Sequence, residues 1–572
     1  MRGRARARLI AVARGDAEPD LVIEGASVFC AFTREWLDGD VAIADGMVAG
    51  VRDYEGGERI DAAGRYLVPG FIDAHVHVES SKLTPAEFAR AVLPHGTTAI
   101  VCDPHEVANV LGADGPHWML DASEGLPLTV FVMASSCVPA SGFESPRRAL
   151  TTGDMESILR RRRALGVAEM MNFPGVIAGD PDVLARLEVS GASHADGHAP
   201  GVLGRSLDAY AAAGIRSDHE ATTYEEALEK RRRGMWVLIR EASGARNLRS
   251  LLPLVAEHGP ERCAFCTDDR DPDFLLHEGH VNQICRVAVT EGIAPEDALV
   301  MATLHPALAH GLDGHGAVAP GYRADLALLD DLERFAPSLV FSGGRIAARE
   351  GRAEPFEAPR VPDFLLQTVH TGPLAEADLA LDAGSAKRVR VIEIVPEQLI
   401  TLQREVEPTR DDGHVVADPE RDLAKVAVIE RHHASGRVGT GLVTGFGLRS
   451  GAFASTVAHD AHNVVAVGVA DSDILACVAR LQELGGGCVV AHGGDVRGEL
   501  ALPVAGLVSD QPVEEVVAGL ESLHRLLAEL GVEIPAPFTT LSFLALSVIP
   551  ALKITDRGLV DVERFEIVPL GV

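Results

Sequence analysis

The sequence is poor in several features that would each point to a particular class of protein. It holds only 8 cysteines in 572 residues, and they are scattered, which excludes a disulfide framework and favours a reducing compartment. Lys and Arg number 52 against 83 Asp and Glu, and the net charge of -31 argues against a nucleic-acid partner, because phosphate binding needs a basic surface. No apolar run approaches the about 20 residues that span a bilayer, so we expect a cytoplasmic protein without a membrane partner.

The length of the chain indicates more than one domain. At 572 residues it exceeds what one hydrophobic core usually supports, so two or three domains are expected. Hydrophobic residues make up 47% and charged residues 24%, as in ordinary soluble proteins. Residues 1–19 are rich in Arg, and their apolar part is too short for a signal peptide, so we expect a surface helix or a tail.

The middle of the chain repeats a strand followed by a helix. Apolar runs that end in polar residues alternate with segments that have helical spacing and C-terminal glycines. The runs occupy residues 71–79, 99–106, 128–136, 167–172, 191–198, 215–220, 236–241 and 264–270. About eight such units are the signature of a (β/α)8 barrel, an α/β fold, which we place at residues 71–314.

Two β-rich segments flank this predicted barrel. Residues 20–70 contain short alternating strands that cannot easily bury their own face. Residues 315–358 hold similar strands, so we predict that the two segments form one small composite β-domain with the barrel inserted between them. After a linker, residues 365–572 combine long strands with a helical segment at 513–531, which predicts an additional C-terminal α+β domain.

The first predicted barrel strand ends in a pair of histidines, His75 and His77. Residues two apart on a strand point to the same face, so both imidazoles aim at one spot. Histidine is the commonest transition-metal ligand, and such a pair suits Zn, Mn or Fe better than Ca or Mg. Strand ends gather at the catalytic face of a barrel, so the pair predicts one corner of a metal site.

Other strand ends supply the remaining ligands of a two-metal site, which needs about five or six ligands and one shared carboxylate. Glu169 lies inside an apolar run, where a carboxylate is costly unless it is paired or binds metal, so it is the candidate bridge. The fifth strand offers His194 and His198, of which His198 lies nearer the strand end. The sixth strand supplies His219, and the eighth supplies Asp268.

Longer motifs add a resemblance to a known family. The segments PGFIDAHVHVES, VCDPHEVANVLG, MNFPGV, DGHAPG and CTDDRDPDFLLHEGH resemble those of the bacterial and archaeal adenine deaminases, which belong to the amidohydrolase superfamily. The resemblance covers roughly residues 20–572, including a C-terminal domain peculiar to that family. It implies hydrolysis of adenine to hypoxanthine and ammonia in purine salvage. It also implies a binuclear divalent metal centre, with manganese expected and iron or zinc as alternatives.

The resemblance also implies roles for the candidate residues. The metal ligands would be His75, His77, Glu169, His198, His219 and Asp268, with Glu169 as the catalytic bridge. A hydroxide held by the metals would attack C6, and Asp268 would carry its proton to the departing amine.

Several strand-end residues are candidates for substrate binding. One of four glutamates would assist N1, and two further residues would read the purine edge or form a salt bridge to a loop; the six are Glu79, Glu106, Glu220, Glu241, Asp269 and Arg270.

Two other functions compete with this interpretation. A cyclic-amide hydrolase of the dihydroorotase or hydantoinase kind often has a lysine on strand four, where this chain has Glu169. A non-catalytic scaffold usually lacks metal ligands, whereas here the set is complete. The zinc deaminases that carry a P-C-x-x-C motif are excluded, because Arg262 precedes the pair Cys263 and Cys266, for which we predict a structural role. We expect a homo-oligomer that acts on a small molecule.

A polar cluster in the C-terminal domain has two interpretations. His459, Asp460, His462 and Asn463 follow one another closely in a β-rich context. They form either a hydrogen-bonded structural turn, or a turn from which His459 or Asn463 approaches the active site of its own or a neighbouring subunit.

Overall fold

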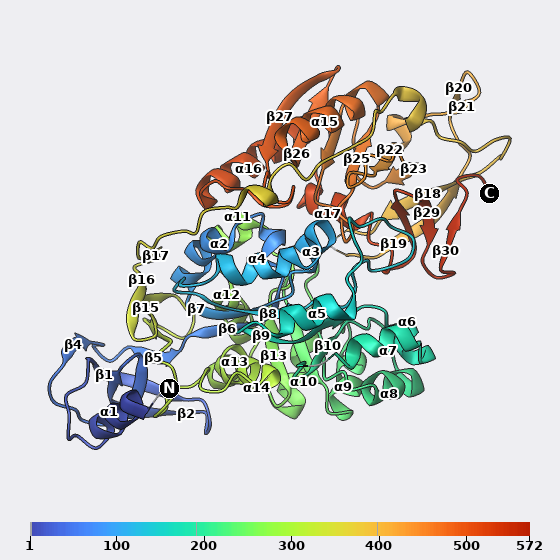
Figure 1. Cartoon of the computed structure of the whole chain (residues 1–572). Coiled ribbons are helices and arrows are strands. Elements are labelled where there is room, and N and C mark those ends of the chain that lie inside the picture. The colour runs from blue at the N-terminus through green and yellow to red at the C-terminus, as the bar shows by residue number, and fades with distance from the viewer. Residues whose placement is uncertain (1–2, 190, 397) are drawn as a thin grey trace.

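The computed structural model describes residues 3–189, 191–396 and 398–572. It contains a barrel, a composite β-sheet beside it and a C-terminal domain seated on the other side of the barrel (Figure 1). In these described residues no helix is both long and apolar enough to cross a membrane. All eight cysteines are unbridged, and Cys263 and Cys266 are buried in the barrel wall.

The barrel has eight parallel strands, and the expected α/β barrel fold is confirmed. Five strands follow the order β10-β9-β8-β7-β6 and three follow β11-β12-β13. Parallel bridges between Ala195 and Ile215 and between Val76 and Asp268 close the ring. The strands are β6 (Phe71–Val76), β7 (Thr97–Cys102), β8 (Thr129–Ala134), β9 (Ala164–Met170), β10 (Ala195–Gly197), β11 (Ser217–Asp218), β12 (Trp236–Arg240) and β13 (Cys263–Cys266).

Helices surround the strands and begin where the sequence supplies caps. Thr84 accepts a hydrogen bond from the amide of Glu87 at the start of α2, and Thr151 and Asp154 form a capping box at α5. The helices are α2 (Pro85–Val92), α3 (His105–Leu111), α4 (Asp114–Ala122), α5 (Thr152–Leu159), α6 (Phe173–Ala178), α7 (Pro181–Leu187), α8 (Gly204–Ala212), α9 (Tyr224–Arg232), α10 (Leu248–His258), α11 (Pro272–His277), α12 (Val281–Thr290), α13 (Pro295–Ala302) and α14 (Leu304–His310).

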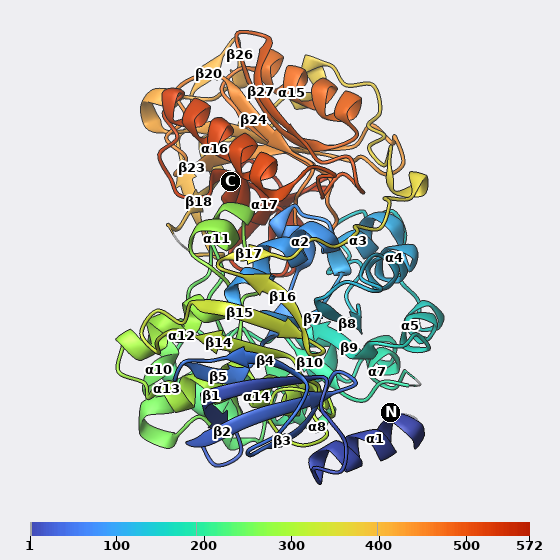
Figure 2. The same cartoon turned by 90° about the vertical axis from the view of Figure 1, so that its left-hand side faces the viewer.

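The composite sheet joins segments from before and after the barrel. Its strand order is β17-β16-β15-β14-β5-β1-β2-β3, with β4 paired to β1, and its blue and yellow strands lie side by side in Figure 2. The link is the antiparallel pair β5–β14, in which Leu67 faces Leu328. Its strands are β1 (Leu21–Cys30), β2 (Glu35–Ala44), β3 (Met47–Val51), β4 (Glu58–Asp61), β5 (Tyr66–Pro69), β14 (Leu326–Leu329), β15 (Pro337–Ser342), β16 (Arg345–Arg349) and β17 (Arg352–Ala353).

The N-terminal segment forms helix α1 (Gly3–Ala13). Its Leu9 and Val12 are buried against Val22, Ala42 and Ala49 of the composite sheet. The apolar part that was too short for a signal peptide therefore packs on β2 and β3.

The C-terminal domain is built on an eight-stranded sheet with helices on both faces. The order is β19-β18-β23-β22-β25-β24-β26-β27. Because strand side chains alternate, Ala452 and Ala454 face α15, whereas Phe453 packs against Phe538 of α17 on the other face. The elements are β18 (Val389–Ile394), β19 (Thr401–Val406), β20 (Arg410–Asp411), β21 (His414–Val415), β22 (Ala424–Ile429), β23 (Val438–Thr444), β24 (Ala452–Ser455), β25 (Val464–Gly468), α15 (Asp471–Leu484), β26 (Gly487–His492), β27 (Asp495–Ala501), α16 (Val513–Glu529), α17 (Pro537–Phe543), β28 (Leu552–Thr555), β29 (Gly558–Asp561) and β30 (Glu566–Val568).

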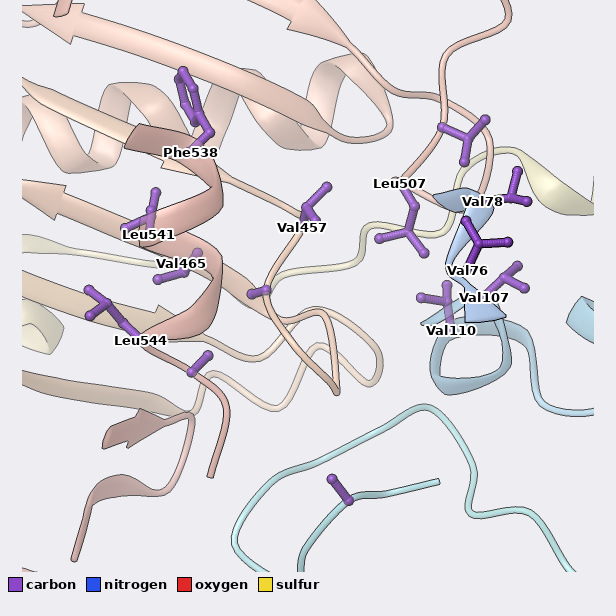
Figure 3. Packing of buried hydrophobic residues seen from close by; sticks show 14 of the residues in the cluster. Val76, Val78, Val107, Val110, Val457, Val465, Leu507, Phe538, Leu541 and Leu544 are labelled. Atoms are coloured by element: carbon purple, nitrogen blue, oxygen red, sulfur yellow. The ribbon is translucent and has the colours of Figure 1, made fainter. Parts of the chain in front are cut away.

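One apolar cluster joins the barrel to the C-terminal domain. Figure 3 shows Leu507 next to Val76, Val107 and Val110 of the barrel. A backbone hydrogen bond of 2.8 Å runs from the amide of Ser509 to the carbonyl oxygen of Lys82. The C-terminal domain is therefore packed directly against the loops at the carboxyl ends of the barrel strands.

This interface contributes to stability. Leu507→Ala removes a fully buried side chain from the shared cluster, so the free energy of unfolding is expected to fall by about 2–4 kcal/mol. Leu308→Ala, at a residue that is 59% exposed, is the control and should change it by less than about 0.5 kcal/mol. Urea unfolding followed by circular dichroism measures both. Equal effects would contradict the assignment of Leu507 to a continuous core.

Candidate metal centre and pocket

His75 in β6 and His77, which lies just after this strand, face each other. The Nε2 atoms of His75 and His77 are 3.0 Å apart, and both side chains are buried. Nδ1 of His77 lies 2.9 Å from the carbonyl oxygen of Asp103 and donates to it, which leaves Nε2 with a free lone pair. This orientation is the one that metal-binding histidines adopt.

Glu169 on β9 lies between two pairs of histidines. Its Oε1 is 3.4 Å from Nε2 of His77 and 3.9 Å from Nε2 of His75. Its Oε2 is 2.6 Å from Nδ1 of His198 and 3.3 Å from Nε2 of His219. Burial alone would raise the pKa of Glu169, but hydrogen bonds from His198 and His219 hold it well below its usual range. Each oxygen of one carboxylate thus faces its own pair of imidazoles, as a bridging ligand requires.

Asp268 completes the first group of donors. Its Oδ1 is 3.1 Å from Nε2 of His77 and 3.5 Å from Nε2 of His75. Its backbone is left-handed, with φ at 56°, a conformation that Asp tolerates better than most residues. Burial would raise its pKa, but Arg240 and the two histidines hold the pKa well below the usual range. Asp268 is therefore kept as a carboxylate.

The donor set fits a pair of divalent cations. The Nε2 atoms of His75 and His77 lie 3.0 Å apart and 3.1 to 3.9 Å from the oxygens of Glu169 and Asp268, the spacing of ligands that share an ion at about 2.1 Å. Mixed imidazole and carboxylate donors suit Mn, Fe and Zn. Nε2 of His198 and Nδ1 of His219, which point away from Glu169, have no hydrogen-bond partner, so neither ring is fixed in a form that blocks the other nitrogen.

The structure separates the two histidines of the fifth strand. His198 contacts Glu169, whereas Nε2 of His194 is 3.0 Å from Nδ1 of His310. His194 is absent from the residues that line the pocket beside the metal ligands. His198 is therefore the candidate strand-five donor at this centre.

A pocket adjoins the candidate metal centre. The barrel contributes His77, His105, Glu169, Met171, His198, His219, Glu220, Arg240, Asp268 and Asp269. The C-terminal domain contributes Leu399, His459, Asp460, Phe543, Leu546 and Ile549. Residues of two domains thus line one pocket, and His459 lies beside the candidate metal centre of its own chain.

Comparison with known proteins identifies the family. The amidohydrolase family model matches residues 66–347, and the model of the adenine deaminase C-terminal domain matches residues 398–566. The chain is 45% identical to adenine deaminase 2 of Carboxydothermus hydrogenoformans over 99% of both chains. It is 45% identical to the adenine deaminase of Desulfatibacillum aliphaticivorans over 98% of this chain and 99% of that one. Identity to the adenine deaminase of Bacillus licheniformis is 43% over 98% of each.

The chain belongs to the adenine deaminase family. The resemblance of the motifs is thereby confirmed. Both matched regions of this adenine deaminase family member contribute to the pocket, since Asp268 lies in the first and Asp460 in the second.

The predicted substrate residues fall into three groups. Glu220 and Asp269 line the pocket. Glu79 and Glu106 lie behind it, where Glu79 accepts from the amide of Val107 and Glu106 accepts from the hydroxyl of Ser80 at 2.7 Å. Burial and the neighbouring Glu106 raise the pKa of Glu79 to about 8. Glu241 lies outside the pocket lining.

Arg270 is not placed to read a substrate. Its guanidinium donates to the carbonyl oxygens of Glu241, Gly279 and His280 and to the side chain of Gln283. These acceptors use its donors, so the structure assigns Arg270 to holding loops, in place of both the expected contact with a purine and the alternative salt bridge. This role could not be predicted from the position of Arg270 after two aspartates, because its acceptors are mostly backbone atoms that are distant in the sequence.

Two titratable residues of this pocket, Arg240 and His105, were not among the residues predicted from the sequence. Arg240 donates to both oxygens of Glu220 and, at 2.9 Å, to Oδ2 of Asp268. Nδ1 of His105 lies 3.5 Å from Oε1 of Glu169. Both residues immediately precede a glutamate that was singled out, so the strand-end position was itself the available signal.

The choice of His198 over His194 can be measured by metal content. Wild-type protein reconstituted with Mn(II) is expected to hold about two ions per chain. His198→Ala should lower Mn(II) affinity at least about 10-fold and leave about one ion, because a direct donor is lost. His194→Ala is the matched control and should keep the wild-type content by plasma mass spectrometry. The reverse result would show that the donor is His194.

Arg240 is expected to stabilise the fold through the charges it neutralises. Arg240→Met leaves the carboxylates of Glu220 and Asp268 buried without their cation, so the metal-free protein should lose about 3–5 kcal/mol of unfolding free energy. Arg249→Met breaks an exposed pair with Glu291 and should cost less than about 1 kcal/mol. Denaturant unfolding measures the loss of unfolding free energy in both variants. Equal losses would show that Arg240 does not stabilise the fold.

Proposed function

We propose that the protein hydrolyses adenine to hypoxanthine and ammonia, a reaction that serves purine salvage. The observation that carries this proposal is the pairing of a six-residue donor set with a pocket closed by the domain that the adenine deaminase C-terminal model matches. Relatives that carry this name align over nearly the whole chain, and not over the barrel alone. The unbridged cysteines fit a cytoplasmic enzyme. A homo-oligomer stays a prediction, which light scattering tests.

The donor set defines which residues would hold the metals. We expect His75, His77, Asp268 and one oxygen of Glu169 at one ion, and His198, His219 and the other oxygen of Glu169 at the second. Manganese is the expected metal, with iron or zinc as alternatives. When bound, divalent cations supply Lewis acidity that makes water nucleophilic near neutral pH.

Asp268 is the proton carrier in this proposal. Arg240 and the histidines keep it deprotonated, so it can accept the proton of the attacking water. Water oxygen bonds to C6, and the bond between C6 and the exocyclic nitrogen breaks. Of the two water protons, one goes through Asp268 to the departing amine, which leaves as ammonia, and the other ends on N1 of the product. One carboxylate thereby serves as base and then as acid.

Glu220 is the candidate partner of N1. Of the four strand-end glutamates it is the one that lines the pocket, and Arg240 orients both of its oxygens. Burial would raise its pKa, whereas Arg240 lowers it, so it is a carboxylate. Protonation of N1 by the second proton of the attacking water prevents negative charge from building up on the ring, and a carboxylate at this place accepts a hydrogen bond from the resulting N1–H.

The function is tested with protein reconstituted with Mn(II) under iron-limiting conditions. Adenine should be converted with release of ammonia, followed by the change in ultraviolet absorbance. Dihydroorotate and hydantoin are assayed beside it. No ammonia from adenine, together with turnover of a cyclic amide, would overturn the proposal in favour of a cyclic-amide hydrolase.

Asp268→Asn tests the proton carrier. The amide cannot take a proton from water, so kcat for adenine should fall by about 10²- to 10⁴-fold while metal content stays close to wild type. Asp121→Asn removes a surface partner of Arg161 and should leave kcat within about twofold. Normal turnover in Asp268→Asn would refute its role.

A further inference from the structure

The C-terminal domain provides the pocket wall that lies opposite the metal ligands. Figure 1 shows this domain, in orange and red, seated over the end of the barrel where the strands stop. Its pocket residues come from three places in the chain, namely Leu399, the turn that contains His459 and Asp460, and residues 543–549. The site is therefore incomplete without this domain.

Most of this wall is apolar and flat. The His459 ring is stacked on Phe543 with centroids 4.5 Å apart and planes 10° apart. Phe543, Leu546 and Ile549 form a small apolar cluster next to Leu399. Such a surface suits the face of an aromatic heterocycle, since stacking and apolar burial do not depend on where the ring carries its polar atoms.

Asp460 is the polar exception in this wall. It is 2% exposed, and its Oδ2 has no hydrogen-bond partner. Its Oδ1 is 3.7 Å from Nε2 of His105 and 3.7 Å from Nδ1 of His459, which is too long for a hydrogen bond. A buried acceptor without a donor is costly, so this oxygen fits a donor that arrives with a ligand.

The other carboxylates of the pocket already have donors. Glu169 is held by histidines, and Glu220 and Asp268 are held by Arg240. Asp269 contacts the hydroxyl of Ser80, whose one proton it shares with Glu106. Within the described part of the chain, Asp460 is the pocket-lining carboxylate with a buried and unpartnered oxygen. It is the acceptor that remains for a substrate.

The position of Asp460 determines which end of a bound purine lies next to it. His105 lies between it and the metal centre, with Nδ1 3.5 Å from Oε1 of Glu169 and Nε2 3.7 Å from Oδ1 of Asp460. A purine whose amino group points at Asp268 turns its five-membered ring away from the metals. In free adenine that ring carries an N–H donor at N9, whereas a nucleoside carries its sugar there.

We propose that Asp460 accepts a hydrogen bond from the N9–H of adenine and so selects the free base over N9-substituted purines. This inference rests on the proposed function. Asp460 acts by binding the substrate, and the stack of His459 on Phe543 covers the ring face.

The barrel holds this turn in place. Backbone amides of Asp460 and Ala461 face the carboxylate of Glu144, whose Oε1 also accepts from the amide of Ser141 at 3.1 Å. Nδ2 of Asn463 donates to the carbonyl oxygen of Ser145 at 3.2 Å. The acceptor is thus positioned by contacts from both domains before a ligand enters, which is what a selective binding group requires.

The first test uses the wild-type Mn(II) enzyme with adenine and 9-methyladenine, which differ in the N9 donor. We expect kcat/KM to be at least about 100-fold higher for adenine, because a charge-assisted hydrogen bond is lost and a methyl group meets a carboxylate. Absence of turnover with adenine would refute the proposed function. Equal turnover of both bases would leave that function standing and overturn the role of Asp460.

The second test uses Asp460→Ala. It should lower kcat/KM for adenine by about 10- to 100-fold, mostly through KM, and reduce the ratio between adenine and 9-methyladenine by at least about 10-fold. Asp460→Asn keeps an acceptor oxygen and should lose less. A purely structural role would lower turnover of both bases alike, so an unchanged ratio would overturn the proposal.

Ser547→Ala is the matched control. Ser547 is buried at the same interface, where its hydroxyl lies 2.6 Å from that of Ser141, but it does not line the pocket. Its kinetics and substrate ratio should match wild type. Metal content and circular dichroism check that each variant is folded. If Asp460→Ala is not folded, the proposal is tested by Asp460→Asn and by the ratio of kcat/KM for adenine to that for 9-methyladenine in the wild-type enzyme.

Discussion

The burial of the Glu169 carboxylate is the constraint on which the site depends. A lone charge at this depth costs several kcal/mol, and it persists here because each oxygen faces two imidazoles that can be protonated or can share a cation with it. The same requirement explains why four histidines converge from three strands. The imidazoles that stabilise the buried carboxylate of Glu169 are also groups that suit a divalent metal, so the same side chains serve both purposes.

Arg240 neutralises the other buried acids around the candidate metal centre. It contacts Glu220 and Asp268 together, so that two further buried carboxylates stay charged next to the first. Without a cation between them, like charges at this distance would force one acid to take up a proton. The proposed division of work, with Asp268 as proton carrier and Glu220 at N1, depends on this single guanidinium.

The C-terminal domain supplies one wall of the pocket beside the candidate metal centre. The shared apolar cluster around Leu507 fixes the domain on the barrel, and residues from Leu399 to Ile549 then cover the metal ligands. The candidate ligands beneath it are buried, and burial strengthens the charge interactions between them. The contribution of both domains to the pocket agrees with a family resemblance that extends through the whole chain.

Much of the fold and the metal centre follows from local sequence, whereas the substrate wall does not. His75 and His77 share a face because strand side chains alternate, and Glu169 is marked by the cost of a carboxylate in an apolar run, so spacing and burial determined these donors. Local pattern cannot distinguish Glu220 from Glu241 or Arg240 from Arg270, because each lies at a strand end and only packing decides which side chain enters the pocket. The tertiary structure alone brings Asp460 to His105, since that contact is set by how two domains pack, and nothing in the neighbouring residues of either one encodes it.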